Sequence, residues 1–219
     1  MISRGEVTRP YDFLVAGVGG QGTVLASDVL AAAGLAAGYD VRKSDVLGLA
    51  VRGGSVISHI RWGERVYSPI IPDGRVDILV AFEYLEGLRW LNQLKPNGTI
   101  LLNRQRIFPV SVSAGDSDYP NSTETIAALQ DAANGVYLLP GLRIAQELGN
   151  ARVLNIVLLG ALSGLLEIAP EIWISVIRER VPTKAADLNV QAFWRGRGIL
   201  AESALGDQKT VEFARQGSL

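Results

Sequence analysis

Apolar residues run almost without interruption from Tyr11 to Val18, where the chain turns into glycine and then into a segment with helical spacing. A second apolar run, from Val76 to Phe82, is followed by leucines at helical spacing between Glu83 and Leu94. Strands that are apolar on both faces are typical of the centre of a parallel sheet, and alternation with helices is typical of crossover connections. The pattern predicts an α/β fold: a Rossmann-like, doubly wound, mostly parallel sheet with helices on both faces.

Weaker patterns complete the expected order of elements. Helical spacing begins at Thr23 and ends before Gly38, a residue that commonly terminates helices. We expect one domain over residues 1–204 with a helical C-terminal part, then a tail at 205–219 that is mobile or lies on a partner. Residues 104–121 are least informative, although 110–113 are compatible with a strand. Further strands are expected at 39–43, 56–62, 66–71, 99–102 and 136–139, and helices at 122–133, 142–148, 151–167, 171–180 and 185–195.

Charge and cysteine content exclude several classes of protein. The 219 residues include 21 Lys and Arg against 22 Asp and Glu, a net charge of -1, so no broad field attracts nucleic acid or an anionic membrane. Without cysteine, this chain can build no disulfide, thiolate nucleophile or iron–sulfur site, and no metal-ligand spacing is present. The most apolar segment, 153–168, falls short of the roughly 20 residues that span a bilayer. We expect a cytoplasmic protein.

The first candidate site is the glycine turn after the first strand. Gly17, Gly19 and Gly22 fit the GxGxxG spacing, which allows a tight turn, close approach of a ligand to the backbone, and close helix packing. Unpaired N–H groups at the start of the helix would face an anion placed there. Gly20 and Gln21 belong to the same predicted phosphate-binding loop. Alternatively, the glycines serve packing only, as in many strand-to-helix turns.

A second glycine pair follows about thirty residues later. Arg52 precedes Gly53 and Gly54, and Ser55 comes directly after them. An Arg fork beside two flexible peptides and a hydroxyl group is suited to clamp an oxyanion or a phosphate. In the alternative interpretation this is an ordinary turn whose Arg pairs with a nearby acid such as Glu64.

The strand after this turn carries the single histidine of the chain. Alternation places Ser55, Ile57, His59 and Arg61 on one face, which is half polar and therefore available for chemistry. His59 is a weak catalytic candidate, because imidazole is the commonest general base. A lone histidine on such a strand is more often a hydrogen-bonded filler, which is the favoured interpretation.

Four more charged residues lie where a Rossmann-like fold binds ligands. Arg42 and Lys43 end the predicted second strand and suit a phosphate on a ribose, while Asp40 has the spacing of an acid that binds ribose hydroxyls. Arg42 and Lys43 could equally be solvated charges at a strand end. Glu83, another weak catalytic candidate, follows a central strand at the ligand-binding edge, or it only opens its helix.

Ordered blocks of sequence from Tyr11 to Gly196 carry a resemblance that is more specific than any single motif. Through them the chain resembles the gamma subunits or domains of 2-oxoacid ferredoxin oxidoreductases, including the beta subunits of indolepyruvate ferredoxin oxidoreductases. The family's usual Gly-Met-Ala-Gln reads Gly48-Leu-Ala-Val51 here. The blocks include GVGGQG at 17–22, RGGSVISHIRWG at 52–63, VYSPIIPDG at 66–74, AFEYLEGLRWLNQLKPNG at 81–98 and ERVPTKAADLNVQAF at 179–193.

The resemblance implies oxidative decarboxylation of an arylpyruvate to an aryl-acetyl-CoA with reduction of ferredoxin. It also implies that thiamine diphosphate with Mg, and iron–sulfur clusters, belong to a larger partner subunit, in a dimer of heterodimers. We expect coenzyme A at the glycine-rich loop, with Arg52 nearby. The catalytic residues stay unassigned, and Arg52 joins His59 and Glu83 as a weak candidate. Two other functions remain open: a free-standing NAD(P)-dependent oxidoreductase, and a non-catalytic nucleotide-binding assembly module.

Overall fold

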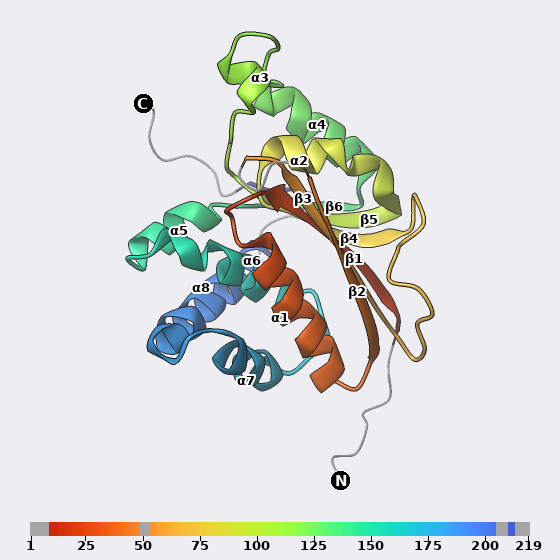
Figure 1. Cartoon of the computed structure of the whole chain (residues 1–219), viewed down its shortest axis with the longest axis vertical. Helices are drawn as coiled ribbons and strands as arrows, with labels where there is room; N and C mark the ends of the chain where they lie inside the picture. Colours follow the sequence, from red (N-terminus) through yellow and green to blue (C-terminus); the bar gives the residue numbers. More distant parts are fainter. Residues whose placement is uncertain (1–8, 49–52, 205–209, 213–219) are drawn as a thin grey trace.

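The computed structural model describes residues 9–48, 53–204 and 210–212, and its centre is a sheet whose two faces are covered by helices (Figure 1). In this part of the chain the sheet has seven strands in the order β2-β3-β1-β4-β5-β6-β7. The strands are β1 (Tyr11–Val18), β2 (Asp40–Leu47), β3 (Ser55–Gly63), β4 (Val76–Ala81), β5 (Leu94–Asn103), β6 (Gly135–Leu139) and β7 (Thr210–Glu212).

The sheet is mixed but mostly parallel. Strands β1, β4, β5, β6 and β7 pair in parallel, as expected for strands joined by crossovers. Strand β3 pairs antiparallel with both β1 and β2, and so it separates β1 from the strand that follows the first helix. The first crossover therefore passes over β3 before it reaches the edge of the sheet.

Two groups of helices cover the two faces of the sheet. Helix α1 lies on one face with α5, α6, α7 and α8, whereas α2 and α4 lie on the other (Figure 1). The predicted α/β class with helices on both faces is confirmed. The helices are α1 (Thr23–Ala36), α2 (Tyr84–Arg89), α3 (Val110–Ser113), α4 (Ser122–Ala132), α5 (Gly141–Glu147), α6 (Leu154–Ser163), α7 (Pro170–Arg180) and α8 (Ala186–Ala204), with short 3-10 turns η1 (Leu91–Gln93), η2 (Ala151–Val153) and η3 (Thr183–Ala185).

Helix α6 is the centre of the helical layer. All ten of its residues are buried, so the central part of the apolar segment is the buried helix that was predicted, although it covers Leu154–Ser163 and not the whole of 151–167. It packs on α8 with very little separation: a Cβ atom on Gly196 would lie 1.9 Å from the Val157 carbonyl oxygen, and one on Gly160 would lie 2.1 Å from that of Phe193. Glycine at both positions therefore sets the distance between the helices. In the described ranges no helix is long and apolar enough to cross a membrane.

Four of the expected strands differ in the structure. Residues 99–102 are the end of the longer strand β5, which begins at Leu94, where a helix was expected to end. Residues 66–71 form a loop, because their backbone groups bond to side chains: Arg61 donates to the Ser68 and Ile70 carbonyls, and the Ile71 N–H donates to His59. Residues 110–113 form the short helix α3, not a strand. Strand β2 continues to Leu47, where a loop was expected. Residues 210–212 pair with β6, and the rest of the proposed tail lies outside the described residues.

Candidate functional site

The two glycine turns meet at the carboxyl edge of the sheet. The Gly19 N–H donates to the Gly54 carbonyl at 2.9 Å, and the Gly53 N–H donates to the Gly19 carbonyl at 3.4 Å. Ligands of open α/β sheets bind at this edge. The structure thus brings together the two motifs that the sequence singled out separately. Arg52 itself lies outside the described residues.

Space and backbone conformation explain two of the glycines in the first turn. A Cβ atom on Gly17 would lie 2.7 Å from Thr23 Oγ1 and 2.9 Å from the Phe82 Cβ, so no side chain fits there. Gly22 has φ of 81° and is the residue before α1. Its side-chain space is taken by Asn155, whose Nδ2 donates to the Gly22 carbonyl at 3.3 Å. The turn is therefore held against both β4 and α6.

The side-chain amide of Gln21 is bonded to other parts of the protein. Its Oε1 accepts a hydrogen bond from the Val18 N–H at 2.8 Å, and its Nε2 donates to the Phe82 carbonyl and to Gln105 Oε1, both at 3.1 Å. Asn103 donates to the same two oxygens at 3.0 Å. These three side chains form an amide cluster under the loop. Gln21 was expected to contact a ligand, and no role was expected for Gln105.

The start of α1 is suited to hold an anion. No side chain caps it, since the residue before it is Gly22, and the N–H groups of its first turn have no partner within the helix. The helix is 14 residues long, so its dipole adds positive potential at this end. Gly20 has φ of 105°, and a Cβ atom built on it would meet nothing within 4 Å. The open side of the loop therefore lies at Gly20.

Ser55 anchors the second glycine turn to α2. Its hydroxyl group donates to Glu86, a carboxylate whose residue is only 2% exposed. Glu86 also accepts from Trp90 Nε1 at 3.2 Å and from Arg89 Nε at 3.1 Å. This Glu86 cluster was not predicted from the sequence. Its only signal there is a glutamate one turn after Glu83. It fixes the position of the turn that carries Gly53 and Gly54.

Glu83 caps a helix. It is fully buried, its Oε1 accepts from the Glu86 N–H at 2.6 Å, and its Oε2 accepts from the Tyr119 hydroxyl group at 2.6 Å. Burial raises the pKa of the Glu83 carboxyl, although the Tyr119 bond opposes that shift. The pKa of Tyr119 is raised as well, mainly by burial and then by its bond to Glu83. The sequence left two interpretations of Glu83, a catalytic group or a residue that begins its helix. The geometry corresponds to the second.

Arg42 and Lys43 are not brought to the glycine turns. Arg42 lies beside Arg61, which lies beside Asp12 near the start of β1, about 20 Å along the strands from the loop. Arg42 bonds to Asp40 at 2.6 Å, and the second oxygen of Asp40 accepts from the Val66 N–H. Lys43 bridges two acids, Asp28 at 2.5 Å and Asp45 at 2.8 Å. In the structure these charges form ion pairs at the edge of the sheet.

His59 is a hydrogen-bonded filler, as the favoured interpretation had it. It is 6% exposed, and its Nδ1 accepts from the Ile71 N–H at 3.4 Å. Burial, and secondarily the Arg61 charge, lower its pKa below the ordinary 6.5, while Asp12 opposes the shift. The supposedly polar face of β3 is therefore largely covered, and Ile57 is buried on it as well.

Replacing His59 by Gln should reduce the loss of stability on acidification. Because the folded-state pKa is lowered, the unfolded chain binds the proton more readily, so stability present above pH 6.5 is lost as the pH falls through that value. Glutamine keeps a hydrogen-bond acceptor but does not titrate there. Thermal unfolding of both proteins between pH 7.5 and 5.5 measures the difference, and equal losses of stability would contradict this account of His59.

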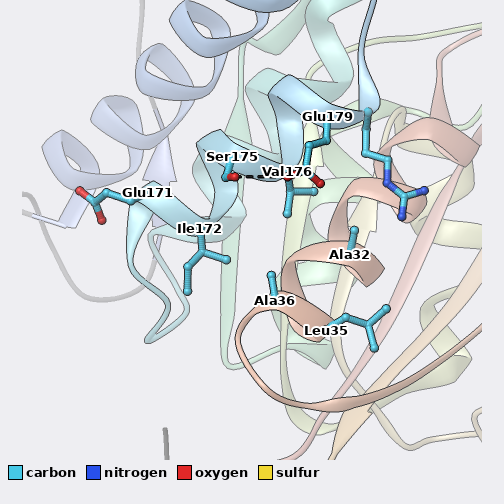
Figure 2. Close-up of a pocket in the computed structure, with 9 residues that line it drawn as sticks. Ala32, Leu35, Ala36, Glu171, Ile172, Ser175, Val176 and Glu179 are labelled. Carbon is cyan, nitrogen blue, oxygen red and sulfur yellow. Dashed lines mark hydrogen bonds between the residues drawn. The ribbon is translucent and has the colours of Figure 1, made fainter. Parts of the chain in front are cut away.

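Two hollows of the structure lie away from the glycine turns. A groove of about 580 Å³ runs between α1 and α7, lined by Ala32, Leu35 and Ile172 and bordered by Glu171, Glu179 and Arg180 (Figure 2). Its nearest α1 residue, Ala32, is about 15 Å along the helix from Gly22. Another hollow, of about 570 Å³, lies at the amino ends of the strands near Arg61 and Lys95. Within the described ranges no three His, Asp or Glu side chains are grouped to hold a metal ion.

Comparisons of sequence point to one family. Residues 12–199 match the model of the pyruvate ferredoxin/flavodoxin oxidoreductase family. The chain is 39% identical over 188 residues to indolepyruvate oxidoreductase subunit IorB of Pyrococcus horikoshii, covering 84% of this chain and 93% of that protein. It is 28% identical over 200 residues to 2-oxoglutarate synthase subunit KorC of Methanothermobacter marburgensis, covering 86% and 95%.

Solved structures share the fold. A keto/oxoacid ferredoxin oxidoreductase gamma subunit from Geobacter sulfurreducens has a TM-score of 0.65 at 23% identity, with 88% of this chain and 99% of that one covered. A 2-oxoglutarate:ferredoxin oxidoreductase from Magnetococcus marinus has a TM-score of 0.69 at 23% identity, but only 31% of its longer chain is covered, against 89% of this one. The chain belongs to the pyruvate ferredoxin/flavodoxin oxidoreductase family, as a small subunit of a 2-oxoacid:ferredoxin oxidoreductase.

Proposed function

We propose that this small subunit serves a cytoplasmic enzyme that oxidatively decarboxylates an arylpyruvate such as indolepyruvate, forms an aryl-acetyl-CoA and reduces ferredoxin. Relatives named as indolepyruvate oxidoreductase subunits are 36% to 39% identical to the chain. Relatives named for 2-oxoglutarate or pyruvate synthases are 26% to 28% identical. The difference in identity supports an aryl substrate over these two.

The redox and decarboxylation chemistry falls to a larger partner subunit in this proposal. Thiamine diphosphate with Mg, and iron–sulfur clusters, would supply that chemistry when bound. The chain has no cysteine to ligate a cluster, and its described part has no grouped carboxylate and histidine ligands for a metal ion. We therefore propose a binding role for this chain. The assembly that we propose is a dimer of heterodimers, and ferredoxin binds to it.

Coenzyme A is the ligand that we propose for the paired glycine turns. The observation that carries this proposal is the junction of Gly19 with Gly53 and Gly54, in front of the uncapped start of α1. Backbone N–H groups and a helix N-terminus are suited to hold a phosphate group. The Magnetococcus marinus enzyme was solved with coenzyme A and succinyl-CoA bound. In our proposal the loop holds phosphate, and Arg52 adds a charged clamp.

Replacing Gly20 by Ala should raise the KM for coenzyme A by about 10-fold or more in the assembled enzyme. The new methyl group would project into the open side of the loop, where the phosphate is proposed to lie. Loss of one or two phosphate hydrogen bonds accounts for an effect of this size. Steady-state kinetics with varied coenzyme A, at saturating 2-oxoacid, measure it. Arg52→Ala should change the KM in the same direction.

Gly149→Ala is the matched control for Gly20→Ala. Gly149 also has a positive φ, 86°, and equally open space at its Cβ position, but it lies after α5. Both variants should lose similar stability, about 1 kcal/mol, from backbone strain. Only Gly20→Ala should change the KM for coenzyme A. If the KM for coenzyme A is unchanged in both Gly20→Ala and Arg52→Ala, coenzyme A does not bind at this loop.

A further inference from the structure

Strand β2 is an open edge of the sheet. One side of its eight residues pairs with β3, and no other strand of the described chain pairs with it. Its last residues are apolar and exposed, Val46 at 48% and Leu47 at 64%. Open edges of this length offer a row of backbone groups to another strand, and proteins usually protect them. Helices α2 and α4, which cover one face of the sheet, pack mainly on β1, β4, β5 and β6.

The side chains of β2 are arranged so that a second copy of the strand would complement them. Consider two copies of β2 that pair as antiparallel strands about a twofold axis at Ser44. Each residue then faces the residue that lies equally far from Ser44 on the other side, in the second copy. Lys43 then faces Asp45 of the second copy, and Val41 faces Leu47. On the other face, Ser44 meets Ser44, and the aliphatic stem of Arg42 covers Val46. The pairing contains opposite charges, apolar pairs and a serine pair, all of which stabilise sheets.

The neighbouring register is much less favourable. A twofold axis must keep each side chain on its own face of the sheet, so the axis can move only by whole residues along the strand. An axis at Lys43 would place the two Lys43 ammonium groups opposite each other and Val41 opposite Asp45. Like charges directly opposite are destabilising. Two copies of β2 are therefore complementary in the register centred on Ser44 and not in the register centred on Lys43.

We propose that β2 is an interface through which two copies of this chain pair as antiparallel strands about Ser44, joining their sheets. Charged residues on an edge strand generally oppose pairing, because most incoming strands leave them without a partner. In this strand Lys43 already lies between Asp28 and Asp45 of its own chain. A second copy brings each lysine another carboxylate and covers the exposed apolar end. This inference rests on β2 alone and is independent of the coenzyme A proposal.

The absence of cysteine makes the register directly measurable, since each introduced thiol is the only one in the chain. In the full-length Ser44→Cys variant, the two Cα atoms would lie about 4.5 to 5.5 Å apart, within the range of about 4.4 to 6.8 Å that disulfides span. Mild oxidation should convert most of the protein to a covalent dimer, visible on a non-reducing gel. The exposed Ser175→Cys on α7 serves as the control for random collisions.

Two further variants test the register and not only proximity. Arg42→Cys and Val46→Cys should each fail to crosslink alone, because equivalent atoms would lie about 14 Å apart. When the two proteins are mixed, they should crosslink to each other. If Ser44→Cys forms a disulfide no faster than Ser175→Cys, or if Arg42→Cys crosslinks with itself equally well, the proposed pairing is wrong.

Reversible association provides a second measurement that needs no thiol. Val46 is exposed and would face Arg42 of the other copy, so Val46→Glu should tighten the dimer and Val46→Lys should weaken it. Two symmetric cross-strand charge pairs correspond to a change of about 2- to 30-fold in the dimer dissociation constant. Sedimentation equilibrium at low salt measures that constant. A monomeric wild-type chain at all accessible concentrations, or equal constants for both variants, would overturn the proposal.

Discussion

Replacing Gly196 by Ala is expected to lower the free energy of unfolding by about 3 kcal/mol or more. The new Cβ atom would lie 1.9 Å from the Val157 carbonyl oxygen, and a backbone atom of α6 cannot turn aside as a side chain can. Helices α6 and α8 would have to separate along their contact. For a domain of this size the loss corresponds to a melting temperature lower by about 6 to 12 °C. Thermal unfolding followed by circular dichroism measures it.

Gly198→Ala on the same helix is the matched control. A Cβ atom on Gly198 would meet nothing within 4 Å, and the residue is exposed. Alanine has a higher helix propensity than glycine, so this variant should be as stable as the wild type or more stable by up to about 1 kcal/mol. If both variants melt at similar temperatures, the close packing of α6 on α8 does not limit stability.

Replacing Gln21 by Glu is expected to raise the KM for coenzyme A by about 10- to 100-fold in the assembled enzyme. The Nε2 donor becomes an oxygen that faces two acceptors, the Phe82 carbonyl and Gln105 Oε1. Unpaired buried groups cost about 1 to 3 kcal/mol each, so the loop should leave its position. The added negative charge also repels the phosphate that we propose for the loop. Kinetics with varied coenzyme A measure the effect.

Gln191→Glu makes the same chemical change on the exposed side of α8 and should leave the KM unchanged. Gln21→Met separates the two causes, because it removes the hydrogen bonds without adding charge. Its KM should rise less than that of Gln21→Glu. If Gln21→Glu binds coenzyme A as well as the wild type, the amide cluster does not position the loop and the loop does not hold the phosphate.

The parts of the fold that the sequence predicted are those set by local patterns. β1 and β4 were recognised because both faces of each strand are buried, and α1 because its periodicity ends at glycine. The insertion of β3 between β1 and β2 depends on pairing between distant segments, which periodicity does not report. Val66 and Ile71 suggested a strand, yet both are buried side chains of the loop between β3 and β4.

The candidate site was predicted where it depends on backbone and missed where it depends on side-chain partners. Glycine spacing indicated two turns, and the structure joins them through Gly19. The inward direction of Gln21 could not be predicted, because its partners come from positions 82 and 105. The role of Glu86 could not be predicted either, because it depends on the bond from Ser55, 31 residues earlier in the chain, and on the bond from Trp90.

Asn155 makes the glycine loop a late product of synthesis. The loop is bonded to positions 53–54, 82 and 105, and the Asn155 amide, 133 residues further along the chain, bonds to Gly22. The glycine loop emerges from the ribosome early. Its last contact can form only after most of the domain has been synthesised. A fragment that ends before α6 would carry the whole glycine motif without its finished shape.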